Sequence, residues 1–290
     1  SYGTTIYLAH RKLVDHVLSV DIRTMDTLHH QITIPSITYR SLTLRVEGLV
    51  YYLMDGASQN TYRGLTSNWE TALYIDSMWY SKALPLSDGQ LVLFSMRDGQ
   101  NILAKKRHGK SQPDFYSGLL TAQGGEGRFS TDGKLLYDPN EQRVLLLYNY
   151  RNTYLVLDTA LNLLHTGKTV DTISHVQLKV GEFEKSRSYV LQESLLVNVQ
   201  ATVHKEFLFV RSNILSANEE PRKFRSNVTI DAYHYPSNRY TYSFYLPNLN
   251  GDKVRDFRIF DNGRLVGLQG RKLIMYQLPP IEGNMEIQTR

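Results

Sequence analysis

The chain has 290 residues, of which 41% are hydrophobic and 21% charged, and its formal net charge is +5. This composition is ordinary for a folded globular protein and excludes low-complexity disorder. The chain has no cysteine, which excludes disulfides, thiolate zinc sites and iron–sulfur clusters. Basic residues are scattered except for two short clusters, 105–110 and 222–225, which are typical of solvated hairpin ends, so we expect no nucleic-acid partner.

Strand signatures follow one another along the chain. Each is a run of four to eight aliphatic, β-branched or aromatic residues that closes at Gly, Asn, Asp or Pro. The clearest runs are 5–10, 17–22, 28–34, 42–46, 49–54 and 273–278. The 20 tyrosines suit a half-buried pleated surface, where the ring packs and the hydroxyl stays wet. The best helical candidate, 184–199, is rich in β-branched residues and serine, which favours two strands there and an all-β chain overall.

Turn dipeptides separate many of these runs. They are Asp88-Gly89, Asp98-Gly99, Asp132-Gly133 and Asn262-Gly263. Each pair supplies the positive φ that a tight hairpin needs, so the pattern predicts consecutive antiparallel hairpins.

A strand–turn–strand pattern repeats along the chain. Its copies are 17–35, 91–110, 154–171 and 228–247, with a less regular copy at 49–66. We interpret them as the two outer strands of β-propeller blades. Blades of about 40–50 residues give six or seven in this length, and we favour six. Two stacked β-sandwiches are the alternative architecture.

The predicted propeller is a single domain over 1–280, with a C-terminal tail at 281–290 and blades of four antiparallel strands. The last segment, 256–278, offers only three good strands. The N-terminal strand at 5–10 could supply the fourth, so that the two termini close the circle and remove exposed sheet edges.

The segments 228–247 (VTIDAYHYPSNRYTYSFYLP) and 254–278 (VRDFRIFDNGRLVGLQGRKLIMYQL) resemble the six-bladed TolB-like β-propellers of Bacteroidetes envelope lipoproteins. Those proteins repeat a blade ending of the form I-x-V-Y-D, turn, strand, F-x-L-P. The glycine-rich stretch 123–129 is similar to a connection common among them, without its usual proline. The resemblance implies a periplasmic or cell-surface location. The sequence leaves open whether a signal peptide or lipid anchor was removed from this chain. It implies no particular activity, because propellers carry unrelated functions on one frame.

Catalytic and membrane-spanning signatures are missing from the sequence. No G-x-S-x-G elbow, HExxH spacing or Walker lysine occurs, and no apolar stretch approaches eighteen residues. One enzymatic alternative stays open, a metal-dependent, lactonase-like hydrolase that holds calcium or another divalent ion on the propeller axis. Its ligands would come from different blades; the candidates, which could equally cap turns or lie exposed, are Asp15, Asp76, Asn149, Asn198, Asp231 and Asp256.

Surface recognition is the function we favour. Several aromatic and basic side chains fall in longer connections between the apolar runs, where propellers place contact residues. They are Tyr62, Trp69, Trp79, Tyr80, Phe115, Tyr116 and Arg128. The two tryptophans could equally be core residues. We predict a monomeric, non-catalytic binding or scaffold protein of a bacterial cell envelope that recognises a protein, peptide or glycan and needs no cofactor.

Overall fold

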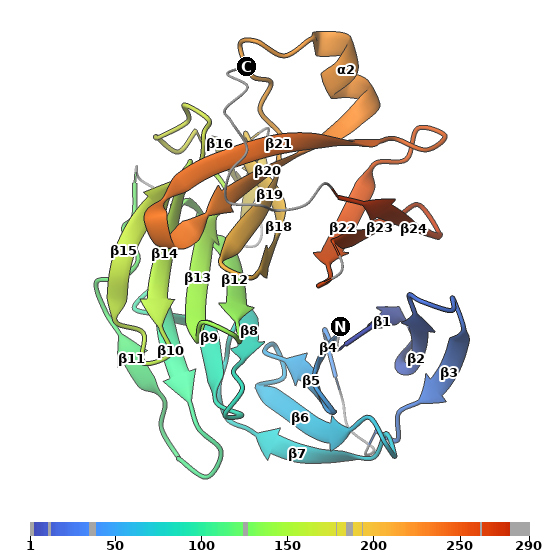
Figure 1. The fold of residues 1–290 in the computed structure, drawn as a ribbon. Helices are drawn as coiled ribbons and strands as arrows, with labels where there is room; N and C mark the ends of the chain where they lie inside the picture. The colour runs from blue at the N-terminus through green and yellow to red at the C-terminus, as the bar shows by residue number, and fades with distance from the viewer. Residues whose placement is uncertain are drawn as a thin grey trace. The chain divides into compact units, whose positions relative to one another are not determined.

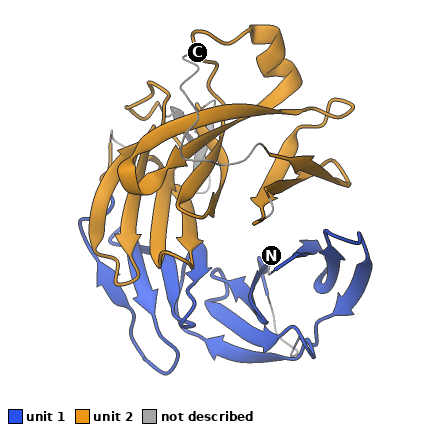
Figure 2. Ribbon diagram, viewed as in Figure 1, with its two compact units in different colours: residues 1–120 blue, residues 121–290 orange. Residues whose placement is uncertain are grey.

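The computed structural model describes residues 3–10, 13–34, 39–123, 127–177, 179–183, 188–192, 194–261 and 263–278. The chain divides into two compact units, Ser1–Leu120 and Thr121–Arg290 (Figure 2). The expected single domain over 1–280 stays a prediction, and the expected tail at 281–290 lies outside the described residues.

The first unit contains three antiparallel sheets of consecutive strands (Figure 1). The strands of the first sheet are β1 (Thr5–His10), β2 (Leu13–Asp21) and β3 (Thr27–Gln31). Those of the second are β4 (Thr43–Glu47), β5 (Val50–Asp55), β6 (Asn60–Leu65) and β7 (Thr71–Ile75). Those of the third are β8 (Lys82–Pro85), β9 (Leu91–Arg97), β10 (Gln100–Lys106) and β11 (Asp114–Tyr116).

The second unit contains three further sheets of the same kind (Figure 1). The strands of the first are β12 (Gly133–Asp138), β13 (Arg143–Tyr148), β14 (Thr153–Asp158) and β15 (Leu163–Lys168). Those of the next are β18 (Asn198–His204), β19 (Phe207–Ser212), β20 (Asn227–His234) and β21 (Arg239–Pro247). Those of the last are β22 (Val254–Ile259), β23 (Arg264–Gln269) and β24 (Lys272–Gln277).

A hairpin and three short helical turns complete the second unit. They are β16 (Lys179–Phe183) with β17 (Ser188–Gln192), α1 (Gly127–Ser130), α2 (Pro221–Ser226) and the 3₁₀ turn η1 (Tyr235–Ser237). The hairpin occupies the wide interval between the repeats at 154–171 and 228–247, where an extra blade had room. Among the described residues no helix is long and apolar enough to cross a lipid bilayer.

Six sheets of three or four antiparallel strands, each formed by successive hairpins, make this an all-β chain with the fold of a six-bladed β-propeller. The predicted class and the favoured blade number are confirmed, and the segment 184–199 carries β17 and the start of β18 as expected. A four-stranded blade is present in four of the six sheets; the first and the last have three described strands.

The N-terminal strand was placed in the wrong sheet by the sequence pattern. β1 pairs with β2, with Ile6 opposite Val20, and does not add to the last sheet. Only two residues separate the end of β1 from the start of β2. Closing a short connection costs much less entropy than closing one that spans the chain. Pairing of β1 with β2 is therefore favoured over pairing with the last sheet.

The repeated pattern also marks different strands in different blades. The copies 154–171 and 228–247 cover the outer strands β14–β15 and β20–β21, as predicted. The copies 91–110 and 49–66 instead cover the middle pairs β9–β10 and β5–β6, because β11 and β7 follow them. The copy 17–35 covers β2 and β3 of a three-stranded sheet.

The glycines of the predicted turn dipeptides have two different roles, in hairpin turns with positive φ and within a strand. Gly89 and Gly99 have φ of +80° and +75° and lie in the hairpins β8–β9 and β9–β10, as predicted. Gly133 is instead the first residue of β12, so the turn predicted at Asp132-Gly133 is wrong. A Cβ at Gly133 would lie 2.6 Å from the carbonyl oxygen of Leu147, so this glycine serves close strand approach. Gly263 also has positive φ, whereas residue 262 lies outside the described residues.

The core is divided among clusters that lie on the sheets of each unit. Within unit 1, Trp69 packs in one such cluster, where it stacks on Tyr51 with ring centroids 5.0 Å apart and on His30 at 4.7 Å. A second cluster joins the β4–β7 sheet to the β8–β11 sheet through Met54, Tyr80 and Leu93. This second cluster fixes the two sheets against each other and thereby shapes the pocket described next.

Candidate binding pocket

A pocket of about 410 Å³ lies in unit 1 where the β4–β7 and β8–β11 sheets meet. Its wall comes from the start of β4, the end of β5 with the turn after it, and the connection from β7 into β8. The lining residues are Ser41, Thr43, Met54, Gly56, Ala57, Trp79, Tyr80, Ser81, Lys82 and Ala83. This volume is within the range of about 300–1,000 Å³ that is usual for small-ligand sites.

Trp79 is presented to the pocket by its two neighbours in the chain. Met78 and Tyr80 are 7% and 5% exposed and belong to the core cluster between the two sheets. The carbonyl oxygen of Trp79 accepts a 2.8 Å hydrogen bond from the Ser95 hydroxyl on β9. With both neighbours anchored inward, the Trp79 side chain remains 36% exposed. The backbone at Trp79 is therefore held in place before any ligand arrives, which lowers the entropic cost of binding.

Tyr80 and Gly56 form the tightest contact in the pocket wall. The Tyr80 hydroxyl donates a 3.0 Å hydrogen bond to the carbonyl oxygen of Asn60 and lies 2.6 Å from the Thr61 hydroxyl. Burial raises the pKa of Tyr80 well above its ordinary value, so the phenol stays neutral. A Cβ at Gly56 would lie 1.8 Å from the carbonyl oxygen of Tyr80, so only glycine fits there.

Asp55 fixes the start of β4 beside the pocket. Its carboxylate accepts hydrogen bonds from the backbone amides of Arg40 at 2.6 Å, Ser41 at 3.3 Å and Ser58 at 3.2 Å. Burial opposes the ionisation of Asp55, but these hydrogen bonds outweigh it and hold the pKa of the carboxyl below its usual value. The ionised carboxylate thereby ties the start of β4 to the end of β5 and sets the position of Ser41.

The polar part of the lining consists of hydroxyls and one cation. Ser41, Thr43 and Ser81 are exposed, and Lys82 is half-buried at the start of β8. The Lys82 ammonium lies 5.2 Å from the centroid of the Phe94 ring on the neighbouring strand. Among the described lining residues there is no aspartate, glutamate or histidine, and Lys82 is the one cationic side chain.

The structure brings two of the seven predicted binding residues, Trp79 and Tyr80, to this pocket. Tyr62 and Trp69 lie in the neighbouring core cluster, 4% and 6% exposed, and at that burial they present almost no surface to a ligand. The sequence could not separate these residues from Trp79, because all four are aromatic residues close to strand ends.

The other three predicted residues are not among those that line the pocket. Phe115 and Tyr116 are on β11, where Phe115 is 38% exposed and the Arg97 guanidinium lies 5.3 Å from its ring centroid. Arg128 is exposed on α1 of unit 2, 5.7 Å from the ring centroid of Phe129. A binding role for these side chains stays a prediction. No local motif in the sequence marks the polar lining residues Ser41, Thr43, Ser81 and Lys82.

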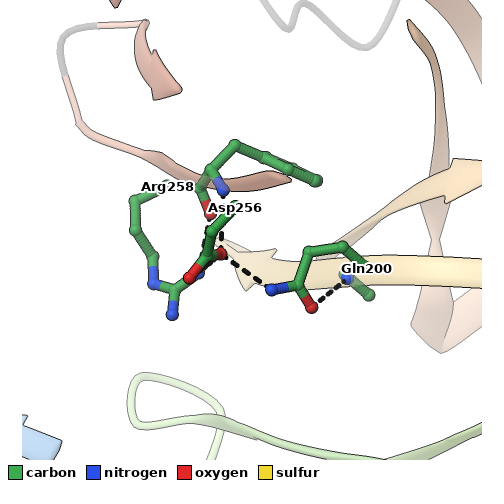
Figure 3. Close-up of polar contacts among 5 residues, drawn as sticks. Gln200, Asp256 and Arg258 are labelled. Atoms are coloured by element: carbon green, nitrogen blue, oxygen red, sulfur yellow. Dashed lines mark hydrogen bonds and ion pairs between the residues drawn. The ribbon is translucent and has the colours of Figure 1, made fainter. Parts of the chain in front are cut away.

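Three candidate metal ligands of unit 2, Asn149, Asn198 and Asp256, are held in polar networks with cationic or amide donors. Gln200 on β18 and Arg258 on β22 donate hydrogen bonds of 2.8 Å and 2.7 Å to the same oxygen of Asp256 (Figure 3). The backbone amide of Phe257 also donates to that oxygen, at 2.8 Å. The Asp256 carboxylate thus links the first strands of two neighbouring sheets.

A second network of unit 2 involves Asn149 and Asn198. The Lys134 ammonium donates to the side-chain oxygen of Asn149 and, at 2.7 Å, to the backbone oxygen of Asn198. The Asn198 amide donates to the backbone oxygens of Tyr148 and Arg151. Oxygens that a cation would need are thus contacted by an ammonium.

The remaining candidate metal ligands are outside these two networks. Asp231 is 5% exposed inside unit 2 and accepts a hydrogen bond from Ser243. In unit 1, Asp15 is half-buried 3.7 Å from the His16 ring nitrogen, and Asp76 is exposed in the β7–β8 connection. In the described part of the chain no three histidine, aspartate or glutamate side chains come together as a metal site.

Comparisons with known proteins return solved structures alone. No family model matches the chain, and no curated protein matches it. The extracellular domain of a protein named as a hybrid two component system, BT4673 from B. thetaiotaomicron, is matched over 91% of this chain with a TM-score of 0.51 and 8% identity. The match covers 31% of that protein's chain. At this identity the likeness shows a shared fold.

Two further matches are weaker. Virginiamycin B lyase from Staphylococcus aureus is matched over 94% of this chain and 80% of its own, with 9% identity and a TM-score of 0.48. A chain of a nidogen/laminin complex is matched over 84% of this chain and 76% of its own, with 7% identity and a TM-score of 0.49. No activity or partner is transferred from them.

Proposed function

We propose that this chain is a non-catalytic binding module whose ligand, a protein, peptide or glycan, contacts the pocket at Trp79. One observation carries the proposal: a 36% exposed tryptophan, anchored by buried neighbours on both sides, stands in the wall of a pocket of about 410 Å³. Tryptophan is enriched among the residues that dominate binding energy, and a fixed aromatic side chain loses little freedom on binding.

We place this module in a bacterial cell envelope, in the periplasm or at the cell surface. This part of the proposal rests on the sequence resemblance of 228–247 and 254–278 to TolB-like propellers of Bacteroidetes envelope lipoproteins. Membership of that group and a lipid anchor are parts of the same proposal.

Peptide and glycan arrays, probed with the labelled chain, test the binding function. We expect Trp79→Ala to abolish the array signals that the wild-type chain gives, because the variant loses the apolar wall of the pocket. Met96→Ala is the matched control, since Met96 is a similarly exposed apolar residue of the same unit outside the pocket. The proposal is wrong if the array signals of the wild-type chain survive in Trp79→Ala.

A further inference from the structure

We propose that His16 and His29 form a surface site for a divalent transition-metal ion, with Cu²⁺ bound most tightly. The two histidines lie in unit 1, on strands β2 and β3, and neither lines the pocket at Trp79. The inference therefore goes beyond the proposed binding function. One contact carries it: Nδ1 of His16 and Nε2 of His29 face each other at 2.8 Å on an exposed part of the sheet.

The pairing of β2 with β3 holds the two histidines on one face of the sheet. His16 lies opposite Gln31, and Leu18 lies opposite His29, so the two histidines are diagonal neighbours across the strands. Opposite and diagonal neighbours of this kind share a face of the sheet. The ladder of backbone hydrogen bonds fixes the points at which the two rings are attached. A metal ion that binds here therefore does not have to order a loop.

The separation of the two nitrogens suits a shared metal ion. Imidazole nitrogens bind such ions at about 2.0–2.1 Å. Two nitrogens at that distance and at about a right angle are about 2.9 Å from each other, as in square-planar Cu²⁺ and Ni²⁺ sites. The observed distance of 2.8 Å is close to this value, and the ring centroids are 4.9 Å apart. A small rotation of the two rings therefore turns both nitrogens toward one ion.

Asp15 prepares His16 as a ligand. Its Oδ2 lies 3.7 Å from Nε2 of His16, the ring nitrogen that does not contact His29. A carboxylate on that side favours the tautomer with the proton on Nε2, which leaves the lone pair of Nδ1 for a metal. In the free chain, Nε2 of His29 then donates its proton to Nδ1 of His16. When the metal binds, His29 carries this proton on its own Nδ1 instead, so no proton is lost.

The ligand type and the exposure of the pair select the ion. Imidazoles bind Cu²⁺, Ni²⁺ and Zn²⁺, with Cu²⁺ the tightest, whereas Ca²⁺ takes oxygen ligands. The side chain of His16 is 39% exposed and His29 is exposed, so a hydrated ion reaches both rings. Among the described residues no third histidine, aspartate or glutamate joins the pair as a ligand, so water completes the coordination.

Calorimetric titration of the full chain with Cu²⁺, with Ca²⁺ as the comparison ion, tests the inference. We expect one tightly bound Cu²⁺ per chain and no comparable binding of Ca²⁺. His29→Gln stays polar but removes one imidazole, so the affinity for Cu²⁺ should fall about tenfold or more, because the second ligand no longer binds within the same molecule. His175→Gln, at an exposed histidine of unit 2 next to the Ser174 hydroxyl, should behave as wild type.

Two further measurements show that the imidazoles themselves hold the ion. The nitrogen hyperfine splitting in the electron paramagnetic resonance of bound Cu²⁺ should indicate two imidazoles in the wild-type chain and one in His29→Gln. Gln31→His adds an imidazole opposite His16, on the face that carries His29, and should tighten Cu²⁺ binding. Circular dichroism and melting temperature confirm that each variant is folded.

Three results would overturn the inference. They are a wild-type chain that binds no Cu²⁺, a His29→Gln chain that binds it as tightly as wild type, and an affinity that Gln31→His leaves unchanged. In the first two cases the contact between His16 and His29 is a hydrogen bond alone, and in the third the ion lies outside this face of the sheet. None of these results bears on the binding function proposed for the pocket at Trp79.

Discussion

Trp79 and Trp69 are ten residues apart and have opposite environments. Trp69 has φ of +57° in the turn after β6, and this backbone directs its ring onto Tyr51 and His30 in the core. Trp79 stands between two buried residues and is left in the pocket wall. The sequence does not show which tryptophan is buried, because this depends on the backbone angles and on which neighbouring side chains pack into the core.

Acrylamide quenching of tryptophan fluorescence checks this contrast, since these are the only two tryptophans of the chain. We expect one quenched and one protected population in the wild-type chain, because Trp79 is 36% exposed and Trp69 only 6%. Trp79→Phe should remove the quenched population. A variant that still loses half of its emission to acrylamide would show that Trp69 is the accessible residue.

Gly56 sets the distance between the β5 turn and Tyr80. Gly56→Ala places a methyl group 1.8 Å from a backbone oxygen that cannot move without shifting Tyr80, so we expect a loss of about 1–3 kcal/mol or more in unfolding free energy. Ligand binding should weaken as well, because Tyr80 is the neighbour of Trp79. Denaturant unfolding measures the first effect, and titration with the array ligand measures the second.

Gly118→Ala is the control for this substitution. Gly118 has φ of +83°, and its added Cβ meets no atom within 4 Å, so the cost there is the left-handed backbone alone, about 1–2 kcal/mol. Ligand binding should be unchanged in this variant. A Gly56→Ala chain with the unfolding free energy of the wild-type chain and intact binding would contradict the close contact between Gly56 and Tyr80.

At the scale of elements, the pair β20–β21 holds a buried carboxyl group. Burial, together with the charges of Glu219 and Asp171, raises the pKa of Asp231 to about 6 against the opposing hydrogen bond from Ser243. The folded chain therefore binds this proton more tightly than the unfolded chain. The protonated Asp231 makes its full contribution to the free energy of unfolding below about pH 4. This contribution falls as the pH rises toward 6, and above the pKa of the folded chain it no longer changes.

Asp231→Asn removes this pH dependence. We expect the unfolding free energy of the wild-type chain to fall by up to about 3 kcal/mol between pH 4 and pH 7 relative to that of the variant. The asparagine oxygen still accepts the hydrogen bond from Ser243. Asp98→Asn, at a highly exposed aspartate, should keep the wild-type profile. Denaturant unfolding measures these free energies. If the unfolding free energies of the wild-type chain and Asp231→Asn depend equally on pH, ionisation of Asp231 does not destabilise the folded chain.

The order of strands within blades shows what the sequence pattern could predict. The alternation of apolar residues and the Asp-Gly turns identified most strands, because both are local properties of four to eight residues. The sequence pattern predicts the wrong partner for β1. Either the first or the last sheet could accept this strand, and the residues within the strand do not decide between the two sheets. The Asp-Gly pattern predicts a turn at Gly133, because the sequence cannot distinguish a glycine that permits close strand approach from one that needs positive φ.

At the scale of the whole molecule, the fold class and the number of blades follow from repetition, whereas the pocket does not. Ser41, Gly56 and Lys82 are small or polar residues at strand ends, and nothing in their spacing marks them as neighbours. They meet because the β4–β7 and β8–β11 sheets pack through a shared core cluster. Of the predicted binding residues, Trp79 and Tyr80 reach the pocket because they lie in the connection between those two sheets.

Hydroxyl-radical footprinting of the full chain, read by mass spectrometry with and without the ligand that the arrays identify, tests the binding site most directly. We predict that the ligand slows oxidation of Trp79 and leaves that of the similarly exposed Phe115 unchanged. Equal oxidation of Trp79 in both states, with protection at Phe115 or within unit 2, would contradict the assignment of the pocket as the binding site.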